Sequence, residues 1–250
     1  MLRFFRNIRQ RLLTENRVSK YLLYAIGEIA LVVIGILIAL QVDNWNEKRK
    51  LRAVQQELLE DLRDDLIESR EELEKGLALN KHTVNQYRII MDAVLRDEPG
   101  SAKIDSAVRY LPNWHSPFFT STTYESIKNN EISIIDNDQL RKQISNLYEQ
   151  QFVFLQEDYD KVEWSIHNSI KIQIFNRYLW FKDEGPVTLK MIKPGVNPVD
   201  FESMKSDPEF IHLVSLLILT RNGGIDQYEL VIRLINDVIN SIDVELARIS

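Results

Sequence analysis

The stretch YLLYAIGEIALVVIGILIALQV, residues 21–42, decides the architecture of this chain. Its 22 residues include a single charged side chain, Glu28. As a helix rising about 1.5 Å per residue, it would be roughly 33 Å long, enough to cross the roughly 30 Å hydrocarbon core of a bilayer. Trp45 follows closely, where an amphipathic ring suits the lipid headgroups. The stretch therefore predicts one transmembrane helix over residues 21–43.

The residues before this helix form a basic leader, residues 1–20, with six arginine and lysine side chains. The leader predicts either an amphipathic helix in the membrane interface or a solvated segment that only sets topology. The positive-inside rule places it in the cytoplasm, although a basic cluster over residues 48–52 weakens the contrast. The apolar run is longer than the core of a cleavable signal peptide. We therefore expect a retained single-pass anchor in a cell inner membrane, in contact with membrane lipid, with residues 44–250 in the periplasm.

Four residues in the span are the candidate intramembrane interaction site: Gly27, Glu28, Gly35 and Ala39. A carboxylate within hydrocarbon is costly, so Glu28 is a functional-site hypothesis. Gly27, Leu31, Gly35 and Ala39 recur every four residues, and the small pair Gly35 and Ala39 permits close helix contact. Glu28 has three possible roles: a hydrogen bond to a neighbouring copy, proton transfer, or pairing with a basic residue of another membrane protein. The simplest alternative is a carboxyl group that reaches the cytoplasmic interface.

Composition excludes several classes of function. The chain has no cysteine, so it has no disulfide, no thiolate nucleophile and no cysteine-ligated zinc. Its net charge of −6, despite the basic leader, argues against nucleic acid as a partner. The four histidines lack the spacing of a metal-binding pair; His82 and His167 could meet, but surface or groove positions are expected for both. We expect no catalytic residue, no metal, no cofactor, and a protein that is not an enzyme.

Residues 44–250 predict an α-helical bundle. A first helix continues from the membrane span to the stop signal at residues 98–100, with Asn80 in one core position. A second long helix, capped by Asp136 or Asn137, runs to about residue 181 and could pair antiparallel with the first. A short helix is expected near residues 101–111 and another near 199–205. Gly223-Gly224 is expected to separate a helix over 208–221 from a last one over 225–248. The predicted fold class is all-α: one N-terminal transmembrane helix continuing into a long-helix antiparallel bundle.

The segment between the two long helices is rich in aromatic and hydroxyl side chains. Trp114, Phe118, Phe119 and Tyr124 form a candidate ligand pocket between helices. The alternative is structural, an insertion that fills the bundle core, since aromatic residues most often serve packing.

The segment YLLYAIGEIALVVIGILIALQVDNWNE resembles a family of uncharacterised single-pass inner-membrane proteins of Bacteroidota, a domain of unknown function. A second block, TYESIKNNEISIIDNDQLRKQI, resembles another family segment, with Asn130 where glycine is expected. The resemblance is close over the first 50 residues and loose over the rest. It implies inner-membrane placement and no activity. The residues that carry it are Ser19-Lys20-Tyr21, Gly27-Glu28, Ile34 to Gln41 and Asn44 to Glu47.

These observations predict a single-pass, membrane-anchored helical-bundle protein that acts by interaction, as a scaffold, an accessory subunit or a sensor. Its partner would be a second copy or another membrane protein. One alternative is a carboxylate-bearing energy-coupling subunit of a proton-driven membrane complex. The other is an extracytoplasmic domain that binds a ligand.

Overall fold

The computed structural model describes residues 18–129, 132–182, 195–198 and 201–249. The chain divides into two compact units, Met1–Gln55 and Gln56–Ser250. Helix α2 (Val18–Leu95) contributes to both. The leader up to residue 17, Asn130 and most of the connector before 201 lie outside the described residues. Within the described part the predicted all-α fold is confirmed, with one small two-stranded ribbon as the exception.

The described part of the first unit is a single helical segment of α2. Every side chain from Ile26 to Trp45 is solvent-exposed. A window of 18 residues in this helix has a mean hydropathy of 2.5, and none of it is buried. By length and composition, this helix could cross a membrane.

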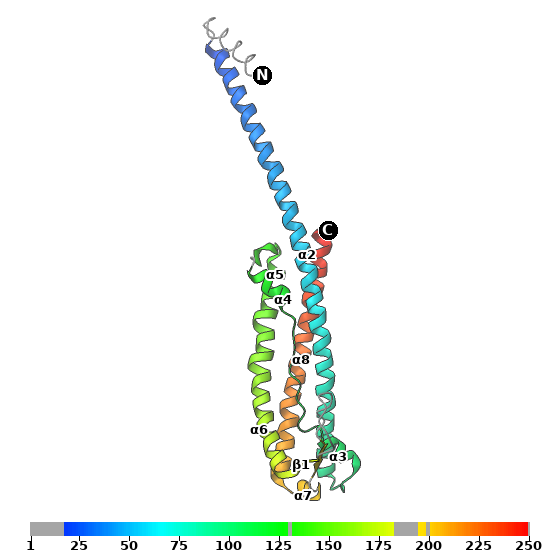
Figure 1. Ribbon diagram of the computed structural model, residues 1–250. Helices are drawn as coiled ribbons and strands as arrows, with labels where there is room; N and C mark the ends of the chain where they lie inside the picture. Colours follow the sequence, from blue (N-terminus) through cyan, green and yellow to red (C-terminus); the bar gives the residue numbers. More distant parts are fainter. Residues whose placement is uncertain (1–17, 130–131, 183–194, 199–200, 250) are drawn as a thin grey trace. The chain divides into compact units, whose positions relative to one another are not determined.

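The second unit contains three long helical paths (Figure 1). The first is α2 from Gln56 onward. The second begins with α5 (Asp138–Asn146), passes through the π-helical segments η2 (Leu147–Gln151) and η3 (Phe154–Asp160), and ends with α6 (Lys161–Tyr178). The third is α8 (Pro208–Ile249). The first two paths run in the same direction and α8 runs against both. The antiparallel pairing predicted for the first two long helices is therefore wrong, and α8 is the antiparallel partner of each.

Shorter elements connect these paths. They are α3 (Ala102–Val108), α4 (Thr122–Asn129), the 3₁₀ turn η1 (Ile132–Ile134), α7 (Phe201–Lys205), and the antiparallel pair β1 (Leu179–Lys182) and β2 (Gly195–Pro198). Helix α2 stops where predicted: Asp97 adopts a left-handed φ of 53°, and the Glu98 N–H donates to the Ala93 carbonyl at 2.9 Å. Asn137 caps α5, as expected, by accepting from the Gln139 and Leu140 N–H groups.

The prediction that Gly223-Gly224 breaks the last helix is wrong, because α8 continues through both glycines. A Cβ at Gly223 would overlap the Tyr159 hydroxyl oxygen, and one at Gly224 would lie 2.9 Å from Glu163 Oε2. The two glycines therefore form a notch, defined here as the Gly223–Gly224 notch, that lets η3 and α6 approach α8. Relative to alanine, each glycine lowers the stability of the helix by about 1 kcal/mol. The close packing of η3 and α6 against α8 offsets this cost.

Two apolar clusters form the core of the second unit. The first joins α2, α4, the α5–η3 path and the C-terminal half of α8, including Leu62, Leu66, Ile144, Leu155 and Ile235. The second joins the end of α2, α3, α6, α7 and the first half of α8, including Tyr87, Ile90, Ile104, Ile174 and Phe210. Between them lies a layer of buried polar side chains, defined here as the polar layer: Asn80, Thr83, Glu163, His167 and Arg221.

An extended segment, residues 113–121, runs along the bundle between α3 and α4 and is called the return segment here (Figure 1). It has no strand partner in the described chain, so helix side chains supply its backbone hydrogen bonds. The Thr120 N–H donates to Ser69 Oγ at 2.9 Å, and Tyr228 Oη donates to the His115 carbonyl at 3.2 Å. The return segment carries the chain from α3, at one end of the bundle, to α4, at the other end. The first and second helical paths can therefore run in the same direction.

Candidate functional site

The intramembrane residues singled out from the sequence lie on the exposed part of α2. Glu28, Gly35 and Ala39 are spaced by seven and four residues and therefore share one helix face, while Gly27 lies beside it. A Cβ at either glycine would meet nothing within 4 Å. The face is open along its length, so another helix could approach it closely.

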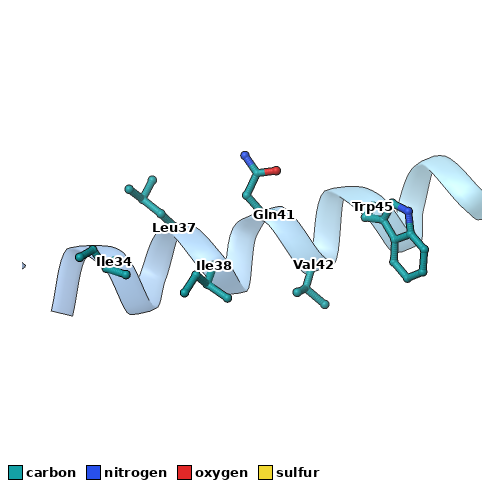
Figure 2. A pocket seen from close by; sticks show the side chains of 6 residues that line it. All are labelled: Ile34, Leu37, Ile38, Gln41, Val42 and Trp45. Atoms are coloured by element: carbon teal, nitrogen blue, oxygen red, sulfur yellow. The ribbon is translucent and has the colours of Figure 1, made fainter. Parts of the chain in front are cut away.

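A shallow apolar groove of about 340 Å³ follows a different face of the same helix (Figure 2). It is lined by Ile34, Leu37, Ile38, Gln41, Val42 and Trp45. Thirteen residues separate Glu28 from Gln41, which at about 100° per residue places them well apart around the helix. The Arg49 guanidinium lies 5.7 Å from the Trp45 ring centroid, within reach of a cation–π interaction.

The polar layer of the second unit is centred on Arg221, which is 3 % exposed. Its Nη1 donates to Asn80 Oδ1 and its Nη2 to the Asn113 carbonyl, each at 3.1 Å. The guanidinium carbon lies 3.9 Å from the centroid of the Trp114 ring. Arg221 therefore joins α8 to α2 and to the start of the return segment, and two oxygens and an aromatic face stabilise its charge.

Trp114 is placed between Arg221 and a buried histidine, His167. The ring centroids of Trp114 and His167 are 5.1 Å apart. His167 is 2 % exposed. Burial, aided by the Arg221 charge, lowers the pKa of His167 to about 4. The expectation of a surface or groove position is wrong for His167, and it does not meet His82, which lies 5.0 Å from the Tyr110 ring.

The Gly223–Gly224 notch receives two side chains of the second helical path. Tyr159 Oη lies 2.8 Å from Glu163 Oε1 and 3.3 Å from the Thr220 carbonyl oxygen. Glu163 is 8 % exposed. Burial raises the pKa of Glu163 to about 7, against the opposing influence of the Tyr159 hydrogen bond and the Arg221 charge. A carboxyl group that titrates near neutral pH is thus enclosed in the bundle.

The four aromatic residues of the predicted ligand pocket are not brought together. Phe119 and Tyr124 line one groove of about 480 Å³, where Phe119 stacks on Phe152 at 4.1 Å and Tyr124 on Tyr148 at 4.3 Å. Trp114 belongs to the polar layer instead, and Phe118 is 68 % exposed. The groove has a mixed rim that includes the ion pair of Lys128 and Glu149, 2.9 Å apart, and the carboxylates of Glu125 and Glu157.

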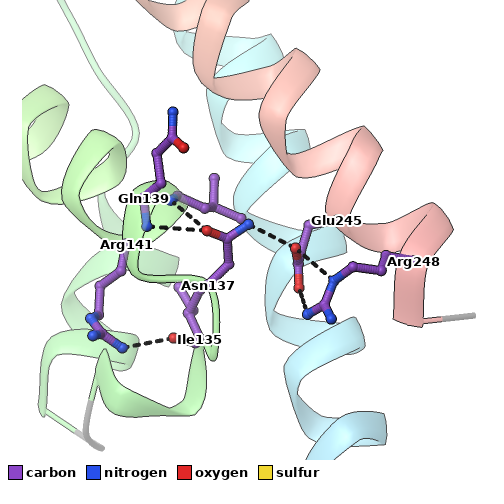
Figure 3. A network of polar contacts seen from close by, with 7 residues as sticks. Ile135, Asn137, Gln139, Arg141, Glu245 and Arg248 are labelled. Carbon is purple, nitrogen blue, oxygen red and sulfur yellow. Dashed lines mark hydrogen bonds and ion pairs between the residues drawn. The ribbon is translucent and has the colours of Figure 1, made fainter.

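A second polar network joins α5 to the end of α8 (Figure 3). Asn137 Nδ2 donates to Glu245 Oε2 at 2.9 Å, while its Oδ1 caps α5. Glu245 is buried and accepts from Arg248 through both oxygens. The Arg248 hydrogen bonds hold the pKa of Glu245 below its usual range. The side-chain amide of Asn137 therefore both caps α5 and links α5 to α8.

Replacing Asn137 with alanine should lower the free energy of unfolding by about 2 kcal/mol, because it removes the α5 cap and one partner of a buried carboxylate. The measurement is chemical denaturation of the full chain in detergent. Asn240→Ala, on the exposed side of α8, is the matched control and should change stability by less than about 0.5 kcal/mol. Equal losses in the two variants would contradict the role of Asn137.

Sequence reasoning missed Arg221 and Glu163. Asn80 was recognised in a core position, but an arginine or a glutamate on an amphipathic helix is usually solvated, so neither signalled burial. The one available signal was Gly223-Gly224, which can mark either a break or a close approach. The described residues contain no group of three or more histidine, cysteine, aspartate or glutamate side chains that could hold a metal ion.

The fold and these sites define a helical-bundle protein with one helix long and apolar enough to span a membrane. The chain belongs to a family described as "Family of unknown function (DUF6090)", whose model matches residues 28–184. The match begins at Glu28 and includes the return segment, Glu163 and His167; Arg221 and the Gly223–Gly224 notch lie beyond it. Comparisons with curated proteins and with solved structures found no match.

Proposed function

We propose that this protein is a single-pass membrane protein that acts by interaction, as a scaffold, an accessory subunit or a sensor, and not as an enzyme. The observation that carries this proposal is the exposed apolar surface of α2 from Ile26 to Trp45. Apolar surface of this extent needs lipid or a partner to cover it. Membrane lipid is the first partner, with the basic leader on the cytoplasmic side of an inner membrane and the helical domain in the periplasm.

The second partner is another helix on the face of Glu28, Gly35 and Ala39. Lipid offers Glu28 no hydrogen bond, whereas a neighbouring helix can supply one. The open space at Gly35 allows the backbones to approach. A second copy of this chain presents the same residues and is the simplest occupant; a basic residue of another membrane protein is the alternative.

Glu28→Gln combined with Gly35→Leu should reduce the mass of the native assembly. The first change removes the carboxyl group, and the second fills the close-contact face. The measurement is native mass analysis of the protein extracted in detergent from its own membrane, with partners trapped by covalent cross-linking. Glu47→Gln, an exposed carboxylate outside the predicted span, is the control and should leave the assembly unchanged.

An unchanged assembly in the double variant would contradict an intramembrane contact on this face. A homo-oligomer in the wild type would favour a scaffold or sensor. A stoichiometric partner with several spans would favour an accessory or energy-coupling subunit, whose activity Glu28→Gln should abolish.

The groove beside Phe119 and Tyr124 supports ligand binding as a second candidate function. Its volume of about 480 Å³ is in the range of small-molecule sites, and its rim holds charged groups above an aromatic base. Saturable thermal stabilisation of the full chain by a small cationic or neutral compound, lost on Phe152→Ala, would support this function. Absence of any stabilising compound would favour a purely structural aromatic cluster.

A further inference from the structure

The second helical path is held against α8 by two side chains that enter the Gly223–Gly224 notch. Tyr159 and Glu163, four residues apart, lie on the same side of this path and meet the two glycines. The π-helical segment η3 ends at Asp160, next to Tyr159. Such segments are rare and often occur at functional sites. This contact is thus built from three unusual features at one level of the bundle: a π-helical segment, a glycine pair and a buried carboxyl group.

Burial of Glu163, which is 8 % exposed, makes the notch more stable when the carboxyl group carries a proton. Tyr159 has one hydroxyl proton and two acceptors within reach, Glu163 and the Thr220 carbonyl. Protonated Glu163 can donate to the Tyr159 oxygen, which leaves the tyrosine proton for Thr220. Ionised Glu163 can only accept, and it receives a single hydrogen bond from the described residues, the one that the Tyr159 hydroxyl donates. A buried carboxylate with one donor is poorly stabilised.

We propose that the insertion of Tyr159 and Glu163 into the Gly223–Gly224 notch is a proton-dependent latch, which holds η3 and α6 against α8 when Glu163 is protonated and loosens when it ionises. This proposal concerns the second unit alone and does not depend on the intramembrane contact. It gives the helical domain a response to the acidity of its surroundings.

Several titratable and charged groups surround Glu163. Asp160, on η3, opposes its ionisation, and Arg221, on α8, favours it. His167 lies one turn further along α6, and His115 faces Arg221 from the return segment. The α2 side contributes the uncharged Asn80. Burial dominates these influences and raises the pKa of Glu163 to about 7, whereas it lowers that of His167 to about 4.

Glu163 and His167 make the stability of the fold depend on pH in opposite directions. Since the folded-state pKa of Glu163 is raised from 4.5 to about 7, the stabilisation by its proton is present at low pH and is lost as pH rises through about 7. Since the folded-state pKa of His167 is lowered from 6.5 to about 4, stability increases as pH rises through that range. A variant at Glu163 therefore has to be compared with the wild type at each pH.

The test is the thermal unfolding midpoint of the full chain in detergent between pH 6 and pH 8. Glu163→Gln imitates the protonated form, so its midpoint should exceed that of the wild type by an amount that grows by about 4 °C over this range. The control Asp158→Asn removes an exposed carboxylate from the same path, and its offset from the wild type should stay constant. A constant offset for Glu163→Gln would overturn the proposal.

A second variant keeps the test decisive if Glu163→Gln does not fold. Tyr159→Phe removes the hydrogen bond that favours the ionised carboxyl, so Glu163 should lose its proton at higher pH than in the wild type. The infrared band of the protonated carboxyl group, followed against pH, reports this directly. Its loss should be centred near pH 7 in the wild type and above that in Tyr159→Phe. A wild-type transition near pH 4.5, or no shift in the variant, would overturn the latch.

Discussion

Replacing Arg221 with methionine is expected to lower the free energy of unfolding by about 3 kcal/mol. Methionine fills a similar volume but leaves Asn80 Oδ1 and the Asn113 carbonyl without their donor. Each buried, unpaired oxygen costs about 1–3 kcal/mol, and the contact with the Trp114 ring is lost as well. For a domain of this size the thermal midpoint should fall by about 9 °C.

Two further variants isolate the contribution of the polar layer. Arg233→Met, on an exposed position of the same helix, should change stability by less than about 0.5 kcal/mol. Asn80→Leu added to Arg221→Met should recover part of the loss, because it removes one of the orphaned oxygens. Chemical denaturation of the full chain measures all three. Equal midpoints for Arg221→Met and Arg233→Met would show that Arg221 does not join the helices.

Replacing Gly223 with alanine is expected to lower the free energy of unfolding by about 2 kcal/mol. In an ordinary helix interior the same substitution stabilises by about 1 kcal/mol, because alanine has the higher helix propensity. Here the new Cβ would overlap the Tyr159 hydroxyl oxygen, whose position is restrained by Glu163 and Thr220. Overpacking of this kind costs more than the gain in propensity.

A double-mutant cycle with Tyr159→Phe distinguishes overpacking from a general intolerance of side chains in α8. Without the hydroxyl oxygen the added methyl group has room, so Gly223→Ala should be neutral or stabilising in the Tyr159→Phe background. Thermal unfolding of the four proteins at one pH gives the coupling energy. A loss of the same size in both backgrounds would contradict the notch.

Local sequence signals were reliable wherever short-range physics decides the outcome. The end of α2 agrees with the stop signal Glu98-Pro99-Gly100, and Asn137, one of the two predicted caps, begins α5. The apolar run predicts a membrane-spanning helix, and the structure has a helix there whose side chains from Ile26 to Trp45 are all exposed. These features depend on hydrogen bonds and side chains within a few residues, which a single sequence contains.

The directions of the long helices and the burial of individual side chains were harder to predict, because both depend on residues far apart in the chain. The similar lengths of the two long helices suggested that they pair antiparallel, but the return segment carries the chain back along the bundle first, so the two paths run in the same direction. Its extended form is possible because Ser69, Arg221 and Tyr228 supply its hydrogen bonds from other elements. No local pattern in residues 113–121 indicates these partners.

The helical fold and the apolar helix can be predicted from the order of the residues. Periodicity and hydropathy are properties of contiguous residues, and the length of an apolar run sets whether it can span a bilayer. The tertiary structure alone decided the roles of Arg221, Glu163 and Gly223-Gly224. A glycine pair can end a helix or admit a neighbour, and a charged side chain can face water or be buried. The choice depends on which side chains other helices bring to the same place.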